Sequence, residues 1–578
     1  MKLLQNKGKL WSKNIVLLQA FFLYSWLTNL QGTDSYYSCY ALCGVLGVLC
    51  LYDNYRARPA FGRSSLVGIS FASALFGLAT VLANYYLFKP ITALMYLMNA
   101  CLTLAGGFFV CFNVLCCALR RLPLKMEEGE RRHPLRVFWF VFGSVVLVDT
   151  VFLLFAMYPG AMTQDSVTTV AQCVKGVYNN IMPFYHTITF KLFYEIGMAL
   201  FGNATDAVAL FHFAQILFLA FCFAYAVMTL YQIGVPKLGL GIVYGIYVFS
   251  FYNIIYSVTL WKDIPFSAAL LLLVTALYRL MKQVGRRHWN YAVLIIGALG
   301  FSLWRTNGWY AFLAAFAVMF FLMRKKYKTL LIIMLLVLIL CWVLINPVLD
   351  GLDVSPMNFV EAFGVPFQQF ARVIWNDRPL TPEQTELLSM AFMLDRVKEL
   401  YTPYTVDPIK FETFYYGNVD YITEHMEDYI KLYIELGLKY PGDYLEAWIE
   451  ETRGYWNGGY LHWIYATGAE VEKYGIENGV RNPLISAAFQ AFFRYQEKPG
   501  ILQPLQSIGF QVWVVIGCFV LNILKKREEF LLSIPVLVLV VGLWLGTPVF
   551  ADFRYAYPVF LCMPVILMTT LYHTKTET

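Results

Sequence analysis

Residues 158–187 read YPGAMTQDSVTTVAQCVKGVYNNIMPFYHT, a polar stretch punctuated by Gly and Pro that lies between long apolar runs. A YPG turn precedes Asp165, and a helical pattern follows at Val167, Val170, Ala171 and Val174. A second pattern opens at Pro183 and His186 and continues through Ile188, Leu192, Phe193 and Ile196. Both patterns are amphipathic, which favours helices that lie at a membrane surface. The stretch is the first place to look for a functional site.

The composition indicates a membrane protein. Of 578 residues, 59% are hydrophobic, 17% aromatic and only 14% charged, and the mean hydropathy is +0.57. Such a chain is too apolar for an ordinary soluble protein. Crossing a bilayer takes about 20 apolar residues in a helix. We find runs of this kind at residues 14–32, 35–52, 65–88, 91–118, 135–157, 206–230, 238–260, 264–280, 289–304, 309–323, 329–348, 508–524, 530–548 and 555–572.

The distribution of Lys and Arg predicts the orientation of these 14 runs. Alternate loops are rich in Lys and Arg, whereas the other short loops contain single cations at Lys89, Lys262, Arg305 and Arg554. Basic loops stay in the cytoplasm. We therefore expect an all-α, multi-pass protein of the cell membrane with about 14 spans and both termini in the cytoplasm.

Charge and cysteine content narrow the function further. Residues 351–505 carry 22 Asp and Glu against 12 Lys and Arg, a net charge of −10, and the rest of the chain carries +17. The positive charge therefore reflects membrane topology, and we expect no nucleic-acid partner. Most of the 12 cysteines lie in apolar runs, and Cys173 is the clear exception, so no disulfide framework or zinc spacing is indicated.

We divide the chain into four parts. Residues 1–136 form an accessory module of four spans, and residues 137–350 form a catalytic membrane core with an external loop at 158–205. Residues 351–505, between spans 11 and 12, are long enough for a domain of their own, and periodic runs at 420–438 and 443–456 predict that it is mostly helical. Residues 506–578 supply the last spans.

The predicted topology gathers many polar residues on the outer side, near span ends. A carboxylate beside several cations at a membrane surface suits chemistry on an anionic lipid headgroup, because the carboxylate can take a proton while the cations bind a phosphate. The gathered residues are Asp165, His186, Lys262, Asp263, Arg305, Asn307, Glu361, Gln368, Gln369, Arg372, Asp552 and Arg554.

Each of these residues also has a purely structural interpretation. Asp165 could cap a helix that starts at Ser166, and His186 could be a satisfied structural histidine. The external Lys and Arg residues could anchor spans at the headgroups, although each has a polar neighbour at Asp263, Asn307 or Asp552. The segment 361–372 could be only a helix cap and face.

Metal binding has little support in the sequence. There is no His or Cys cluster with ligand spacing. A divalent cation held by Asp165 and a carboxylate of a second loop stays open, so the cofactor is unknown.

An ordered set of motifs resembles the GT-C superfamily of integral-membrane glycosyltransferases, and within it an uncharacterised bacterial branch of DUF6020-type proteins. The resemblance covers about residues 135–572. In chain order the motifs are YPG with DS (Tyr158, Pro159, Gly160, Asp165, Ser166), a Pro and His-Thr element (Pro183, His186, Thr187), WKD (Lys262, Asp263), R-x-N-G (Arg305, Asn307, Gly308), P-x-QQ-x-x-R (Pro366, Gln368, Gln369, Arg372), YP-x-x-Y ahead of YW (Tyr440, Pro441, Tyr444, Trp456) and RYAYP (Arg554 to Pro558).

The resemblance implies an inverting transferase that moves a sugar from a polyprenyl-phosphate donor to an envelope glycan, glycolipid or protein outside the membrane. The superfamily's catalytic Asp corresponds to Asp165, which would deprotonate the acceptor hydroxyl. Candidates to bind the donor phosphate are Lys262, Arg305, Arg372 and Arg554. Candidates to bind or support the substrate are His186, Asp263, Asn307, Glu361, Gln368 and Gln369.

Two other functions compete with this interpretation. A transporter or flippase of a lipid-linked envelope precursor would also be polytopic, but it should place ionisable residues near the bilayer midplane and show internal repeats. A ligase or polymerase of lipid-linked oligosaccharides would share the fold and use a lipid-diphosphate donor. The sequence does not decide between the two kinds of donor.

Overall fold

The computed structural model describes residues 9–31, 37–88, 92–126, 133–459, 469–498, 502–546 and 549–572, and Lys89 lies outside them. Within these ranges the chain is helical, with only isolated β-bridges and no β-sheet. The all-α prediction is confirmed.

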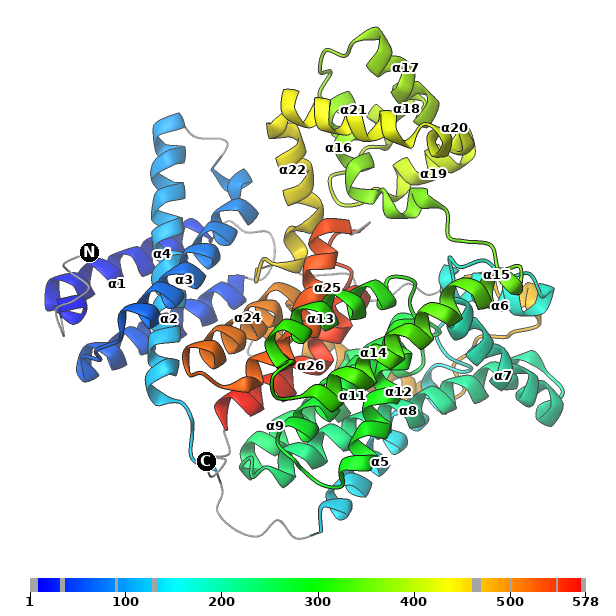
Figure 1. Cartoon of the computed structure of the whole chain (residues 1–578), viewed down its shortest axis with the longest axis horizontal. Helices are drawn as coiled ribbons and strands as arrows, with labels where there is room; N and C mark the ends of the chain where they lie inside the picture. The colour runs from blue at the N-terminus through cyan, green and yellow to red at the C-terminus, as the bar shows by residue number, and fades with distance from the viewer. Residues whose placement is uncertain are drawn as a thin grey trace.

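The N-terminal helices form a bundle of their own, at the left of Figure 1. Small residues let the backbones approach closely. A Cβ on Gly106 would lie 2.4 Å from the carbonyl oxygen of Phe22, and one on Gly77 would lie 2.5 Å from that of Leu104. The elements are η2 (Lys9–Trp11), α1 (Lys13–Asn29), α2 (Tyr37–Ala57), α3 (Arg63–Ala83), η3 (Tyr85–Leu87) and α4 (Ala93–Arg121).

A larger helical core follows and is completed by the C-terminal helices. The first group comprises α5 (Pro134–Val151), η4 (Phe152–Ala156), α8 (Ala204–Gln232), α9 (Lys237–Phe249), α10 (Phe251–Ser257), α11 (Asp263–Met281), α12 (Arg287–Leu303), α13 (Gly308–Met323), α14 (Lys328–Val343), η5 (Leu344–Val348) and α15 (Leu349–Gly351). The C-terminal group comprises η9 (Gln503–Leu505), α24 (Ile508–Leu524), η10 (Glu528–Leu532), α25 (Ser533–Gly546) and α26 (Phe553–Leu571).

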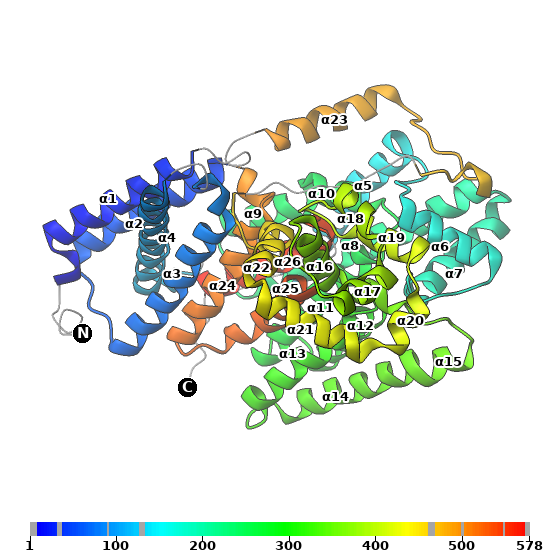
Figure 2. The ribbon, with the colours of Figure 1, turned by 90° about the horizontal axis from the view of Figure 1, so that it is seen from above.

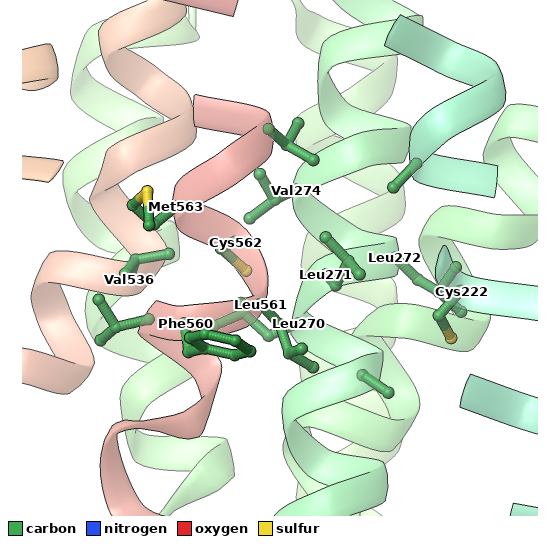
Figure 3. Close-up of a cluster of buried hydrophobic side chains, with 14 of the residues drawn as sticks. Cys222, Leu270, Leu271, Leu272, Val274, Val536, Phe560, Leu561, Cys562 and Met563 are labelled. Carbon is green, nitrogen blue, oxygen red and sulfur yellow. The ribbon is translucent and has the colours of Figure 1, made fainter. Parts of the chain in front are cut away.

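Helix α11 is the centre of this core. Nearly every one of its residues is buried, which is the pattern of a helix that is apolar on all sides. Figure 3 shows Leu270, Leu271 and Val274 of α11 facing Leu561 and Cys562 of α26. Because α11 is enclosed, its two ends are the only places where it can carry charge close to solvent.

The remaining helices lie around the periphery of the core. Figure 1 shows α16–α21 as a separate lobe that α22 joins to the core, and Figure 2 shows α23 along one edge and α14 along the opposite edge. The elements are α6 (Gln164–Lys175), α7 (Phe184–Phe201), η6 (Phe359–Ala362), α16 (Gly364–Trp375), α17 (Pro382–Ala391), α18 (Leu394–Leu400), α19 (Asp407–Tyr416), α20 (Val419–Glu424), α21 (Met426–Lys439), α22 (Pro441–Thr452), η7 (Arg453–Tyr455), η8 (Glu472–Tyr474) and α23 (Pro483–Glu497).

Several sequence-based expectations can be compared with these elements. The patterns after Asp165 and Pro183 are helices α6 and α7, and neither is among the helices long and apolar enough to cross a membrane. The helical prediction for 420–438 and 443–456 is confirmed by α20, α21 and α22, with a break between α20 and α21.

Fewer helices are long and apolar enough to cross a membrane than the 14 apolar runs in the sequence. A helix occupies each of the runs, but within the described residues eight are long and apolar enough, or nine if the bent pair α9 and α10 is one span. Helices α1, α12 and α24 have 17 residues and α13 has 16, and at about 1.5 Å per residue these fall short of a hydrocarbon core of about 30 Å. Helix α2 has 21 residues but contains Asp53, Asn54 and Arg56.

The tight contact between α11 and α12 yields the first prediction. A Cβ on Gly297 would lie 2.7 Å from the backbone nitrogen of Leu273 and 2.9 Å from the carbonyl oxygen of Ala269. Gly297→Leu should therefore force the helices apart and cost about 1–3 kcal/mol. The control is Gly241→Leu on α9, where an added Cβ meets nothing within 4 Å. A lower thermal unfolding midpoint in detergent is expected for Gly297→Leu only; equal midpoints would contradict the close packing.

Candidate functional site

The loop before α6 is tied to the segment before α11. The N–H of Ala161 donates to the carbonyl of Val258 at 2.7 Å, and the hydroxyl of Ser166 donates to the carbonyl of Leu260 at 3.0 Å. Thr163 and Ser166 form a capping box, so α6 begins at Gln164. Asp165 is therefore not the N-cap that its position suggested. Its side chain is left for contacts outside its own helix.

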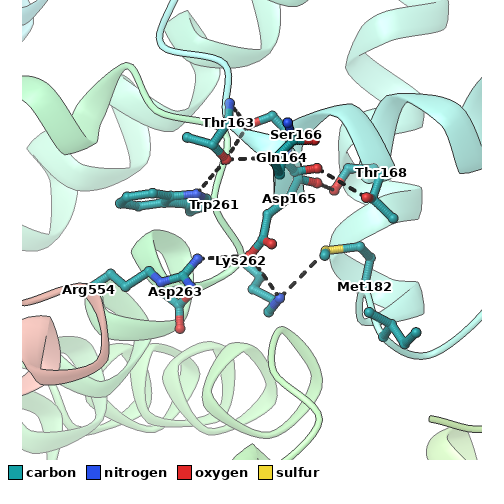
Figure 4. Close-up of polar contacts among 12 residues, drawn as sticks. Thr163, Gln164, Asp165, Ser166, Thr168, Met182, Trp261, Lys262, Asp263 and Arg554 are labelled. Carbon is teal, nitrogen blue, oxygen red and sulfur yellow. Dashed lines mark hydrogen bonds and ion pairs between the residues drawn. The ribbon is translucent and has the colours of Figure 1, made fainter. Parts of the chain in front are cut away.

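Two cations from distant parts of the chain meet the carboxylate of Asp165 (Figure 4). Its Oδ2 lies 3.3 Å from Nζ of Lys262, which precedes α11, and 2.9 Å from a guanidinium nitrogen of Arg554, in the first turn of α26. The indole of Trp261 donates to the hydroxyl of Thr163 at 2.8 Å. Helices α6, α11 and α26 thus present their N-terminal ends to one point.

Two further ion pairs adjoin the contacts of Asp165. Arg305, between α12 and α13, lies 3.0 Å from Oδ1 of Asp263, and Nε of Arg554 lies 2.8 Å from Oδ2 of Asp552. The ring of Tyr555 joins the two pairs, because the guanidinium carbons of Arg305 and Arg554 lie 4.8 and 4.7 Å from its centroid. The ion-pair cluster consists of Asp165, Lys262, Asp263, Arg305, Asp552 and Arg554.

The cluster is balanced in charge but uneven in exposure. Three cations face three carboxylates, and the side chains of Asp263 and Asp552 are only 1% and 2% exposed. The side chain of Asp165 is 28% exposed. Asp263 and Asp552 therefore hold the two Arg side chains from the buried side of the cluster, while Asp165 is the carboxylate that a ligand in the solvent can reach.

The two carboxylates differ in acidity. Burial works to raise the pKa of Asp165, but the charges of Lys262 and Arg554 outweigh it and lower that pKa to about 2. Burial raises the pKa of Asp552 to about 6, despite the opposing charge of Arg554. At neutral pH both are ionised, and Asp552 is the one that titrates in mildly acidic solution.

His186 lies buried near the start of α7. It is 1% exposed, and neither ring nitrogen has a hydrogen-bond partner among the described residues. Burial and the charge of Lys262 lower its pKa to about 3, so its ring is neutral. Its ring meets the edge of Phe211. The interpretation of His186 as a histidine with satisfied hydrogen bonds is not supported.

Five of the proposed substrate residues lie outside the ion-pair cluster, and His186 is one of them. Asn307 is exposed at the start of α13, and its side chain does not cap that helix. Glu361 pairs with Lys410 at 2.8 Å inside the lobe. The side-chain amides of Gln368 and Gln369 donate to the carbonyls of Thr402 and Tyr444, at 2.5 and 3.0 Å.

Arg372 is also engaged elsewhere. Its guanidinium binds the carboxylates of Glu446 and Glu450 on α22 and donates to the hydroxyl of Tyr401 at 3.0 Å, and its side chain is 6% exposed. Arg372 therefore holds α16 against α22. The structure brings Lys262, Arg305 and Arg554 together with Asp165, but it does not bring Arg372 to them.

Sequence reasoning missed several members of the site. Trp261 and Tyr555 lie under the guanidinium of Arg554, with ring centroids 5.1 and 4.7 Å away, and Sδ of Met182 lies 3.5 Å from Nζ of Lys262. Trp261 and Tyr555 could have been found, because they adjoin the charged residues of the WKD and RYAYP motifs. Nothing in the sequence singles out Met182.

The described residues contain no group of three or more His, Cys, Asp or Glu side chains placed to hold a metal ion. All 12 cysteines are free.

The opposite pKa shifts of Asp165 and Asp552 predict opposite dependences of stability on pH. The pKa of Asp165 is lowered from 3.8 to about 2, so its ionised form stabilises the fold by roughly 2 kcal/mol above pH 4, and the contribution is lost as the pH falls through 2. Asp165→Asn should lower the thermal midpoint equally at pH 5 and pH 7. If the midpoints of the wild type and the variant were equal at pH 5, the ion pairs of Asp165 would not stabilise the fold as proposed.

Asp552→Asn should behave differently. The pKa of Asp552 is raised from 3.8 to about 6, so the wild type gains stability from its proton at low pH and loses it as the pH rises through 6. Asn keeps the N-cap of α26, because its oxygen can still accept from the N–H of Arg554. The thermal midpoint of the variant relative to the wild type should therefore rise between pH 4 and pH 7.

Comparison with known proteins assigns the chain to a family without assigning an activity. No curated protein matches the chain, and no solved structure does. A model described as a family of unknown function, DUF6020, matches residues 177–578. The matched region includes Lys262, Arg305 and Arg554, whereas Asp165 precedes it. Because the match covers more than half of its length, this multi-pass membrane-type helical chain belongs to the DUF6020 family.

Proposed function

We propose that the protein is a GT-C-type glycosyltransferase that moves a sugar from a polyprenyl-phosphate donor to a cell-envelope glycan, glycolipid or protein. The observation that carries the proposal is the partly exposed Asp165 held between Lys262 and Arg554. The proposal includes 14 membrane passes, cytoplasmic termini, the four-part division of the chain and a site on the extracytoplasmic side.

The cations of the ion-pair cluster suit a lipid phosphate. Lys262, Arg305 and Arg554 are 13–16% exposed, so each can reach a ligand while its stem stays packed. A guanidinium offers two parallel donors to a phosphate, and the guanidinium carbons of Arg305 and Arg554 lie within 5 Å of the centroid of the same Tyr555 ring, at 4.8 and 4.7 Å. A phosphate bound here would displace the cations' contacts with Asp165 before those with the buried Asp263 and Asp552.

The proposed reaction is a single displacement. A hydroxyl oxygen of the acceptor attacks the anomeric carbon of the donor sugar and forms the new glycosidic bond. The bond from that carbon to the phosphate oxygen breaks, and its electron pair leaves with the lipid phosphate, whose added charge Lys262, Arg305 and Arg554 neutralise. Asp165 takes the proton of the attacking hydroxyl.

Donor binding would also set the strength of the base. With a pKa of about 2, Asp165 in the empty site is a poor base. A phosphate that draws Lys262 and Arg554 toward itself removes the two charges that lower this pKa, so the carboxylate becomes more basic only when the donor is in place. Hydroxyl activation is thereby restricted to the loaded site.

The other predicted residues take supporting roles in this proposal. Asp263 positions Arg305, Asp552 positions Arg554, and the neutral ring of His186 is buried near the cluster, with neither nitrogen paired among the described residues. Asn307 borders the loop of Arg305. Glu361, Gln368, Gln369 and Arg372 hold the lobe together and act on the substrate only through its position.

The position of the cluster favours an enzyme over a transporter or flippase. Lys262 precedes α11, and Arg554 lies in the first turn of α26, so both are at helix ends. A transporter usually has its ionisable residues near the middle of its helices, in broken segments. The transport hypothesis remains the alternative outcome of the experiment below.

The proposal predicts that Asp165→Asn abolishes transfer. Purified protein in detergent is given radiolabelled polyprenyl-phosphate sugars and envelope extract. Loss of the base should lower the rate by about 10²-fold or more. The control is Asp377→Asn, which removes a carboxylate of a surface ion pair with Lys398. Thermal midpoints establish that both variants fold.

The outcomes separate the hypotheses. Full activity in folded Asp165→Asn would overturn the role of Asp165 as the base. Absence of transfer from every donor, together with lipid scrambling in liposomes, would identify a flippase.

A second prediction concerns donor affinity and pH. Below pH 6 Asp552 is protonated, because burial raises its pKa to about 6, and Arg554 then loses one ionised competitor of the donor phosphate. A phosphodiester keeps its single negative charge over this range. KM for the donor should therefore fall roughly threefold or more between pH 7 and pH 5. In Asp552→Asn, KM for the donor should not change between pH 7 and pH 5. If KM of the variant falls with pH as it does in the wild type, Asp552 is not the group responsible.

A further inference from the structure

A cavity is lined by residues that are distant in the sequence from Asp165, Lys262 and Asp263 of the ion-pair cluster. This cavity, of about 280 Å³, separates the N-terminal helices α2, α3 and α4 from α24 and the end of α26. This volume is close to the lower end of ligand pockets and well above that of a cavity that holds benzene. Figures 1 and 2 show α24 beside the N-terminal bundle in both views.

The cavity is long and narrow. On α24 its lining residues Phe510, Trp513, Gly517 and Leu521 recur every three or four positions and so form one stripe. The twelve residues from Phe510 to Leu521 cover about 16 Å along the helix axis, and the lining from Val110 of α4 to Leu122, the residue after its end, covers about 18 Å. A groove with these proportions fits an extended chain better than a compact ligand.

The lining is apolar along its length and contains no charged side chain among the described residues. Its polar groups lie mainly near one end, where Asn457 is 3% exposed. Oδ1 of Asn457 accepts from the hydroxyl of Tyr40 and from the N–H of Gly459 at 3.2 Å, which fixes the orientation of the amide. Nδ2 of Asn457 then has no partner among the described residues. An unpaired buried donor is costly, so a ligand with an acceptor oxygen is favoured there.

We propose that this groove binds one acyl chain of a bilayer glycerolipid, whose ester carbonyl accepts a hydrogen bond from Nδ2 of Asn457. An isoprenyl chain has no oxygen to pair with that donor, and a phosphate would find no cation. Water is disfavoured along the apolar part, since a buried water needs several polar partners. The inference does not depend on the proposed transferase activity.

The bound chain would act as a link between two parts of the molecule. The N-terminal bundle and α24 line the groove from two sides. They also touch directly, as at Phe76 and Trp513, whose ring centroids are 5.0 Å apart. At the far end the N–H of Leu124 donates to the carbonyl of Leu571 at 2.8 Å. An acyl chain would fill the space between these contacts with the methylene groups that packing requires.

Gly517 offers a variant that closes the groove without disturbing its walls. A Cβ at this position would meet nothing closer than Cδ2 of Leu115, at 3.9 Å, so the side chain of Gly517→Phe would extend into the cavity. The matched control is Gly542→Phe on α25, where an added Cβ meets nothing within 4 Å and the residue is exposed.

The test measures lipid that stays with the full-length protein through purification in a mild detergent. Mass spectrometry of the extracted lipid should find about one glycerolipid per chain for the wild type and for Gly542→Phe. For Gly517→Phe the retained amount should fall roughly tenfold or more. Retention of isoprenoid lipid in place of glycerolipid would overturn the occupant, and equal retention in all three proteins would overturn the groove.

A second measurement on the wild type removes the dependence on folding of the variant. Two phosphatidylcholine probes carry a photoreactive diazirine, one next to the ester carbonyl and one at the end of the acyl chain, in vesicles that contain the protein. The first should label peptides around Asn457, and the second should label peptides around Leu122 or Leu571 at the other end. Labelling spread over the lipid-facing helices, with no preference for these peptides, would refute the proposal.

Discussion

The need to balance charge at the buried end of α11 governs the architecture of the site. Lys262 and Asp263 stand where the most enclosed helix of the core begins, and a lone charge there would carry a large desolvation cost. Asp165 and Arg305 supply opposite charges from other segments, at 3.3 and 3.0 Å. Removing one partner would leave the other buried and unpaired, so the pairs fix how α6, α11 and α12 meet.

The same need to balance charge accounts for the contacts of Arg554 at the start of α26. Arg554 is placed between Asp165 and Asp552, 2.9 and 2.8 Å away, and stacks near Trp261 and Tyr555. One carboxylate is buried and the other is partly exposed, so the two contacts differ in how easily a ligand replaces them. A charge-balanced cluster satisfies its buried charges, and its one partly exposed carboxylate marks the contact that a ligand would replace most easily.

Local patterns in the sequence predicted where the helices lie better than which residues cap them or pair with one another. Apolar runs identified the positions of the core helices, since burial by period and length is a local property. Arg554 pairs with its sequence neighbour Asp552, whereas Arg305 pairs with Asp263 of another loop and not with its neighbour Asn307. The N-cap of α6 is Thr163, whose hydroxyl lies one residue before the helix, and Asp165 is therefore not needed as a cap. The two carboxylates that bind Arg372 lie 74 and 78 residues further along the chain. Such pairings depend on tertiary packing, which a single sequence does not display.

A short segment connects the two sites. Tyr455 donates its hydroxyl to the carbonyl of Val549 at 2.7 Å and accepts from the N–H of Asp552 at 3.1 Å, so it holds the turn that leads to Arg554. Asn457, two residues further on, lies at the end of the apolar groove. A lipid bound at Asn457 would order the segment that carries Tyr455 and thereby the turn before α26. If the groove binds a lipid as proposed, its occupancy would be coupled to the position of Arg554 through this short stretch of backbone.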